Sequence, residues 1–89
     1  MRVTNLTSNN SNRSVPNQFE LRDDYGNVFF QSYDSIIVKI DNTGKTFLDE
    51  RYWNYSKTTS KYRNQFLGEC TKETEAKIKT GEYTLCNLN

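Results

Sequence analysis

Residues 36–49 read Ile36-Ile37-Val38-Lys39-Ile40-Asp41-Asn42-Thr43-Gly44-Lys45-Thr46-Phe47-Leu48-Asp49. The first five are strand-forming types, and alternation directs Ile36, Val38 and Ile40 to one side of a strand. Residues 41–44 have turn composition, because Gly44 can adopt a positive φ at no steric cost. The stretch therefore predicts two antiparallel strands joined by a tight turn.

The pattern continues toward the N-terminus as a second hairpin. Phe19 and Leu21 alternate with polar residues, and residues 24–27 (Asp-Tyr-Gly-Asn) have the composition of a turn. A strand pattern resumes at Val28. The centre of the chain is therefore expected to form a meander of four strands.

Two helices and a last strand are predicted in the C-terminal half. The first helix should lie between the hydroxyl-rich residues 56–59, which offer several N-caps, and Gly68, which ends it. The second should start with Thr71 as its N-cap and end at Gly81. Residues 82–86 then return as a strand.

Grouped strands followed by helices indicate an α+β fold. We expect an antiparallel sheet of four to five strands with two short helices on one face. Along the chain, four strands come first, then the two helices, then the last strand. The following residues are predicted to form one core: Phe19, Leu21, Val28, Phe30, Ile36, Val38, Ile40, Leu48, Phe66, Leu67, Ile78 and Leu85.

The N-terminal segment has a different composition from the rest. Residues 4–17 are polar, short-chained and closed by the single proline, so they bury too little apolar area to offset chain ordering. We expect residues 1–17 to form a flexible N-terminal arm, which could order on a partner, and residues 18–89 to form a single domain.

Charge and hydropathy argue against several classes of protein, mildly in the case of a dedicated nucleic-acid binder. Twelve basic residues nearly balance eleven acidic ones, whereas a dedicated nucleic-acid binder usually has a clear basic excess. No segment approaches the roughly 20 apolar residues of a membrane helix, and residues 1–6 lack the apolar core of a signal peptide. We expect a cytoplasmic protein without a membrane partner.

The sequence offers no catalytic constellation. It has no histidine, the commonest general base and metal ligand, and Cys70 and Cys86 alone do not make a zinc site. Its four glycines are spread singly, so a phosphate-binding loop is not expected. The acidic pairs at 23–24 and 49–50 lie where turns and strand ends already favour Asp. We predict a protein that is not an enzyme and needs no cofactor or metal.

Residues 51–67 are the best candidate for a binding surface. They contain the single Trp, three of the six Tyr and five basic residues that no acidic residue interrupts. Such residues suit stacking on bases and neutralising phosphates, but they are equally enriched at protein–protein hot spots. Alternatively, the apolar ones face the core and the cations are merely solvated. The candidate partner surface consists of Arg51, Tyr52, Trp53, Tyr55, Lys57, Thr58, Thr59, Lys61 and Arg63.

Three short motifs follow one another within residues 28–68. They are Phe30-Gln31-Ser32-Tyr33, then Trp53-Asn54-Tyr55-Ser56-Lys57-Thr58-Thr59-Ser60-Lys61, then Phe66-Leu67. In this order they resemble a family of small proteins of unknown function carried by phages and mobile elements of low-GC bacteria. Tyr62 stands where the family often has His, so a role for an imidazole does not carry over. The resemblance implies a phage or mobile-element source.

Small accessory phage proteins of this kind often inhibit host enzymes or defence systems. We therefore expect a non-enzymatic protein in the cytoplasm of a bacterial host that binds and inhibits a host protein or ribonucleoprotein complex, such as a CRISPR effector (an anti-CRISPR protein) or another defence factor. One alternative is a small nucleic-acid-binding protein that uses its aromatic and basic surface. Another is a structural or assembly component.

Overall fold

The hairpin predicted over residues 36–49 is present in the computed structural model, which describes residues 1–8 and 12–89 of the chain. Strands β4 (Ser35–Ile40) and β5 (Thr46–Asp49) pair antiparallel. Asp41 organises the turn between them, because its Oδ1 accepts hydrogen bonds from the backbone N–H groups of Thr43 and Lys45 at 2.9 and 3.0 Å. The local sequence thus determines both strands and their connection.

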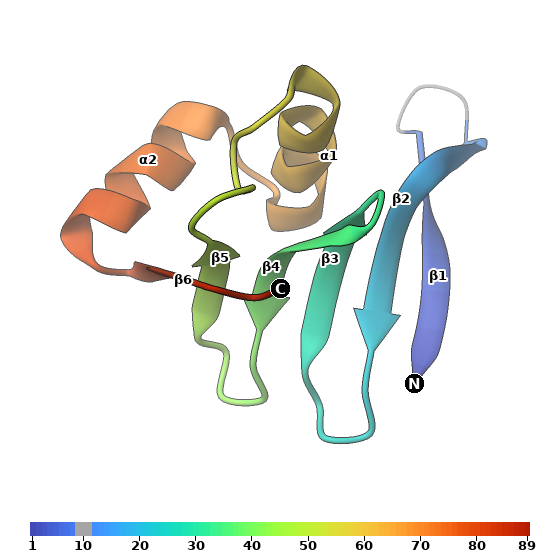
Figure 1. Ribbon diagram of the computed structural model, residues 1–89, viewed down its shortest axis with the longest axis horizontal. Helices are drawn as coiled ribbons and strands as arrows, with labels where there is room; N and C mark the ends of the chain where they lie inside the picture. Colours follow the sequence, from blue (N-terminus) through green and yellow to red (C-terminus); the bar gives the residue numbers. More distant parts are fainter. Residues whose placement is uncertain (9–11) are drawn as a thin grey trace.

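Six strands form one sheet in the order β1 to β6 (Figure 1). Neighbouring strands are antiparallel from β1 to β5, whereas β5 and β6 are parallel. The remaining elements are β1 (Arg2–Thr7), β2 (Ser14–Arg22), β3 (Val28–Ser32), α1 (Lys57–Leu67), α2 (Thr71–Thr80) and β6 (Tyr83–Cys86). The α+β class is confirmed, with a mixed sheet.

The prediction of four to five antiparallel strands is wrong in strand number and in the direction of β6. Strand β1 was missed because it lies at the sheet edge and five of its six residues are exposed, so no alternation of apolar residues marks it. Backbone pairing with β2, rather than burial, holds it in the sheet. The β5–β6 connection passes through two helices, and such a crossover returns the chain for a parallel pairing.

Much of the predicted N-terminal arm lies in strands. Residues 2–7 form β1, and residues 14–17 begin β2, where Val15 is buried and Asn17 adopts a positive φ of 65°. Residues 9–11 lie outside the described residues. The arm's flexibility, and its ordering on a partner, stay predictions.

Both helices pack on the same face of the sheet, on the side of β3 to β6 (Figure 1). The Phe66 ring of α1 stacks on Phe30 of β3 with centroids 5.7 Å apart. Lys77 of α2 lies over the ring of Tyr83 in β6. The N-cap of α2 is Cys70, one residue before the predicted Thr71. Neither helix in the described part of the chain is long and apolar enough to cross a bilayer.

The core forms between this face and the helices. Its buried apolar residues are Val15, Phe30, Ile37, Val38, Leu48, Tyr62 and Tyr83. Phe19 and Leu21 are not among them, because the register pairs Leu21 with Phe29 and so turns both side chains to the opposite face. Leu85 was also predicted in the core but is 40% exposed.

Candidate binding surface

Asp49, the last residue of β5, fixes the segment that follows it. Its side chain is only 1% exposed. Oδ2 accepts hydrogen bonds from the backbone N–H groups of Arg51 and Tyr52 at 3.1 and 2.9 Å. Oδ1 accepts from Leu88 N–H at 2.9 Å, so one carboxylate joins the turn after β5 to the C-terminal tail.

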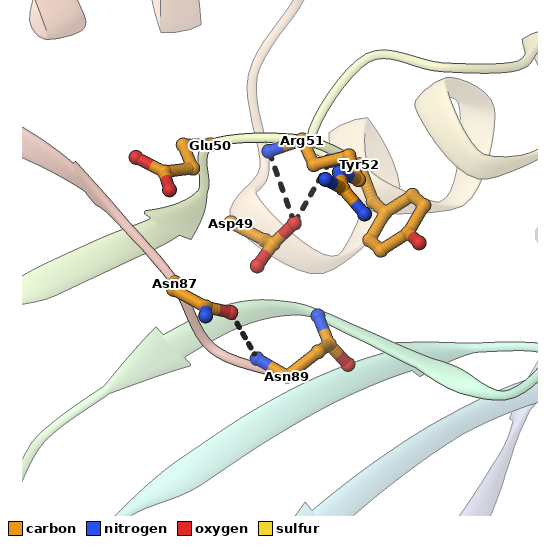
Figure 2. A pocket seen from close by; sticks show the side chains of 6 residues that line it. All are labelled: Asp49, Glu50, Arg51, Tyr52, Asn87 and Asn89. Carbon is orange, nitrogen blue, oxygen red and sulfur yellow. Dashed lines mark hydrogen bonds between the residues drawn. The ribbon is translucent and has the colours of Figure 1, made fainter.

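A polar pocket of about 180 Å³ opens beside this carboxylate (Figure 2). Figure 2 shows Arg51 and Tyr52 on one side of Asp49 and the tail residues Asn87 and Asn89 on the other. Asn89 is itself held by β4, since its amide donates to Ile36 C=O at 2.9 Å and accepts from Ile36 N–H at 2.7 Å. The pocket is therefore built from backbone-anchored polar groups.

A second, more open pocket of about 310 Å³ lies at the start of α1. Ser56 is the N-cap, and its hydroxyl accepts from Thr59 N–H at 3.1 Å. Ser60 Oγ donates to Asn54 Oδ1 at 2.7 Å, which ties the preceding loop to the first turn. The pocket is lined by Asn54, Tyr55, Ser56, Lys57 and Ser60.

Arg63 holds the loop and the helix together from the inside. It is fully buried, and its guanidinium lies over the Trp53 ring at 5.1 Å from the centroid. It donates hydrogen bonds to Trp53 C=O, to Asn64 Oδ1 at 3.0 Å and to Thr71 Oγ1 at 2.9 Å. Burial lowers the pKa of Arg63, and its partners are carbonyls and hydroxyls rather than a carboxylate.

The predicted surface residues divide into three groups. Thr59 and Arg63 are buried, and Thr59 Oγ1 lies 2.8 Å from Ser32 Oγ, so both residues are architectural. Trp53 is half-buried and covered by Arg63 on one face. The remaining residues are named here the 51–61 surface: Arg51, Tyr55, Lys57, Thr58 and Lys61, which are exposed, and Tyr52, which is half-buried against the core.

Aromatic and cationic groups are combined within the 51–61 surface. The rings of Tyr52 and Tyr55 meet edge to face, with centroids 5.4 Å apart. The Arg51 guanidinium lies 6.0 Å from the Tyr52 ring centroid, and Lys61 Nζ lies 5.2 Å from that of Tyr62. In the described part of the chain, Arg51 and Lys61 form no salt bridge. The surface therefore offers cations beside aromatic rings, with the exposed carboxylate of Glu50 lining the same pocket as Arg51.

A separate ionic cluster joins α2 to β6. The Glu69 carboxylate accepts from Tyr83 OH and lies 3.0 Å from Lys77 Nζ. Burial and the bond to Glu69 raise the pKa of Tyr83, and the same carboxylate raises that of Lys77. The cluster therefore ties α2 to β6. Among residues 1–8 and 12–89, no three His, Cys, Asp or Glu side chains lie together as a metal site would require.

Asp49, Glu50, Asn87 and Asn89 line the first pocket but were missing from the predicted site. Asp49 had been considered only as half of an acidic pair, and its contacts to Leu88 span 39 positions of the sequence. No local pattern encodes that pairing. The signal that was available is an Asp at the end of a strand, where its carboxylate often accepts hydrogen bonds from the following turn.

Asp49 should make stability depend on pH. Burial raises the pKa of its carboxyl, but the backbone hydrogen bonds from Leu88 and Tyr52 outweigh it, so the pKa is lowered. A lowered folded-state pKa gives stability that is present above the unfolded pKa of about 3.9 and is lost as pH falls through the folded value. We expect Asp49→Asn to reduce the free energy of unfolding at pH 7 by about 1–3 kcal/mol.

The difference between wild type and Asp49→Asn should shrink as the pH falls below about 4, because the wild-type carboxylate then becomes protonated. Urea unfolding followed across the acid range measures it. Asp24→Asn, at an exposed turn position, is the control and should leave the profile unchanged. A difference that stays constant with pH would contradict the assignment.

Comparison with known proteins identifies a family. A family model described as a family of unknown function (DUF8033) matches residues 1–82. The match includes all of the 51–61 surface and every strand except β6. Neither the curated proteins nor the solved structures provide a match.

Proposed function

This chain belongs to the DUF8033 family, and we propose that it is a non-enzymatic phage or mobile-element protein that binds and inhibits a host protein complex. The target would be a CRISPR effector, which would make the chain an anti-CRISPR protein, or another defence factor in the bacterial cytoplasm. The contact would be made by the 51–61 surface. An acidic protein surface is the partner chemistry that fits its cations.

The observation that carries the proposal is the preorganised Tyr52–Tyr55 pair. Asp49 fixes the backbone of Tyr52, and Ser60 holds the loop before Ser56 through Asn54. Aromatic side chains on a fixed backbone lose little entropy on binding and are typical anchors of protein interfaces. The pockets on either side could accept side chains of a partner.

A nucleic-acid function at the same surface has less support. That hypothesis used Tyr52, Trp53 and Tyr55 as a stacking platform, but one face of the Trp53 ring is already occupied by Arg63. The Tyr52 and Tyr55 rings meet at 73°, so they do not present parallel faces to successive bases. A protein partner is therefore the better reading of this surface.

Capture of a partner from host lysate tests the proposal. Tyr55→Ala and Lys57→Glu should abolish capture of a specific protein by the tagged chain, and should also abolish its protection of an infecting phage from the host's defence. The melting temperature should not change, because Tyr55 and Lys57 are exposed.

Lys72→Glu is the matched control, since Lys57 and Lys72 each lie in the first turn of a helix, where Glu is tolerated. Thr58→Ala should likewise leave the melting temperature unchanged, because Ser56 rather than Thr58 caps α1. If the Lys57 and Lys72 variants capture the same protein equally well, the 51–61 surface is not the contact site.

A further inference from the structure

The turn between β3 and β4 holds an aromatic residue in a backbone conformation that favours glycine. The turn consists of Tyr33 and Asp34, since Ser32 pairs with Ser35 across it. Of the two turn residues, only Tyr33 has a positive φ, of 56°. A positive φ at the first position alone is typical of the type II′ hairpin turn, in which glycine normally holds that position. Tyr33 therefore keeps a bulky side chain where its Cβ is sterically unfavourable.

Hydrogen bonds from both sides enforce this conformation of Tyr33. Its backbone N–H donates to Asn17 C=O at 2.7 Å, and its C=O accepts from the side-chain amide of Gln31 at 2.7 Å. Asn17 itself has a positive φ of 65°, so the first bond joins two residues of uncommon backbone conformation. Strained residues persist only where the surrounding structure determines them, and they gather at functional sites.

The contacts of the Tyr33 side chain do not explain why a tyrosine is there. Tyr33 is 46% exposed. In the part of the chain that the structure describes, its ring pairs with no other aromatic ring and its hydroxyl makes no hydrogen bond. Glycine would form the same turn without the steric cost. The fold alone therefore gives no reason for a large aromatic side chain at this position.

Tyr33 lies next to the 51–61 surface. Its neighbour Ser32 has its Oγ 2.8 Å from Oγ1 of Thr59, in the first turn of α1. Figure 1 shows the β3–β4 turn at the same end of the sheet as α1. On the β4 side, Ile36 is bonded to Asn89, which lines the pocket at the end of β5. The turn is thus joined by one contact to the start of α1 and by another to the polar pocket.

We propose that Tyr33 is a further anchor for the protein partner, presented at the surface by the strained turn. The inference rests on the proposed function, because it extends the same contact surface. A tyrosine ring supplies a large contact area at little cost in entropy, and its hydroxyl takes a hydrogen bond when buried. The exposed ring and unpaired hydroxyl of Tyr33 fit an apolar cleft in the partner that has a hydrogen-bond acceptor on its wall.

Thermal unfolding of the glycine and alanine variants tests the strain. Tyr33→Gly should melt about 4–8 °C above Tyr33→Ala, since both lack the ring but only alanine keeps a Cβ at positive φ. Tyr33→Gly should also melt no lower than wild type. Tyr25 is the matched control, because it is 79% exposed in the β2–β3 turn and has an ordinary φ. There the glycine variant should melt below the alanine variant. If Tyr33→Gly melts well below wild type, the ring is structural and the inference is overturned.

Titration of the captured protein tests the contact. The protein that the wild-type chain captures, once purified, is the probe, and biolayer interferometry measures its affinity for each variant. Tyr33→Gly should weaken binding about thirtyfold, the usual effect of removing an interface anchor, although the variant is at least as stable as wild type. A gain in stability with a loss of binding is typical of strain kept for function. Tyr25→Gly should bind as wild type, and an equal loss in both variants would overturn the inference.

Lys57→Glu separates this inference from the proposed function. If Lys57→Glu loses the captured protein while Tyr33→Gly binds it as wild type, the 51–61 surface is the contact site and Tyr33 is not an anchor. If Tyr33→Gly loses it while Lys57→Glu retains it, Tyr33 is an anchor and the 51–61 surface is not the contact site. If the wild-type chain captures no specific protein, the proposed function and the role of Tyr33 are both wrong.

Discussion

Arg63→Met is expected to lower the free energy of unfolding by about 3 kcal/mol, although Arg63 carries a charge and methionine is apolar. The fully buried guanidinium donates to Trp53 C=O, Asn64 and Thr71, and these partners remain when the arginine is replaced. Buried acceptors that lose their donor are costly, whereas replacing both sides of such an interaction can be nearly neutral. Methionine fills most of the volume, so the effect reports mainly on hydrogen bonding.

Urea unfolding monitored by the fluorescence of Trp53 measures this effect, because the indole lies directly under the guanidinium. Arg63→Lys should be almost as destabilising, since an ammonium cannot reproduce the planar fork that reaches several acceptors. Arg51→Met is the control at an exposed arginine and should change stability by less than about 0.5 kcal/mol. Equal stability of the Arg63 and Arg51 variants would show that the buried network contributes nothing.

Arg63 also shows where sequence reasoning fails and what could have corrected it. It was assigned to the partner surface because it belongs to the aromatic and basic run over residues 51–67. Yet Thr59, Tyr62, Arg63 and Phe66 follow the spacing of one helical face. Three of these four are buried and Phe66 packs against the core. Periodicity was therefore a better guide than residue type at this position.

The regular elements were predictable wherever a local signal existed. The hairpin over residues 36–49 has alternation on both sides of a turn with a glycine. Gly68 and Gly81 end the two helices in left-handed conformations, as their positions in the sequence predicted. In each case the decisive interactions lie within a few residues of one another, so they can be read without the rest of the fold.

Register and face were not predictable, because they depend on pairing between distant residues. The β2–β3 register pairs Leu21 with Phe29 and thereby separates Leu21 from the core. A bulge between β3 and β4 shifts the pairing after Phe30 and leaves both Ile37 and Val38 fully buried. A shift of the strand register by one residue moves every side chain of that strand to the other face of the sheet. The alternation of apolar and polar residues in the sequence is compatible with both registers.

The same limit applies to the candidate site. The aromatic and basic composition of residues 51–61 identified the surface, and most of its members are exposed. The pocket beside Asp49 was not identified, because it needs the C-terminal tail to fold back across the end of β5. Composition can thus locate a surface, whereas the shape of the surface requires the tertiary structure.

Phe30→Ala should be the most destabilising truncation of an apolar side chain, lowering the free energy of unfolding by about 3–5 kcal/mol. Phe30 is fully buried at the centre of the sheet and stacks on Phe66 of α1, so its loss removes the main apolar contact between α1 and β3. Phe66→Ala should have a smaller effect, since that ring is only half-buried and solvent can fill part of the space it leaves.

Phe29→Ala is the matched control for Phe30→Ala, because it removes the same side chain at the adjacent position of the same strand. Phe29 lies on the face of the sheet opposite the helices and is half-buried, so its removal leaves no enclosed cavity. The loss in free energy of unfolding should be less than half that of Phe30→Ala. Urea unfolding of the two variants gives the comparison directly. If Phe29→Ala is the more destabilising of the two, the faces of β3 are assigned the wrong way round, and Phe29 rather than Phe30 lies on the buried side of the sheet.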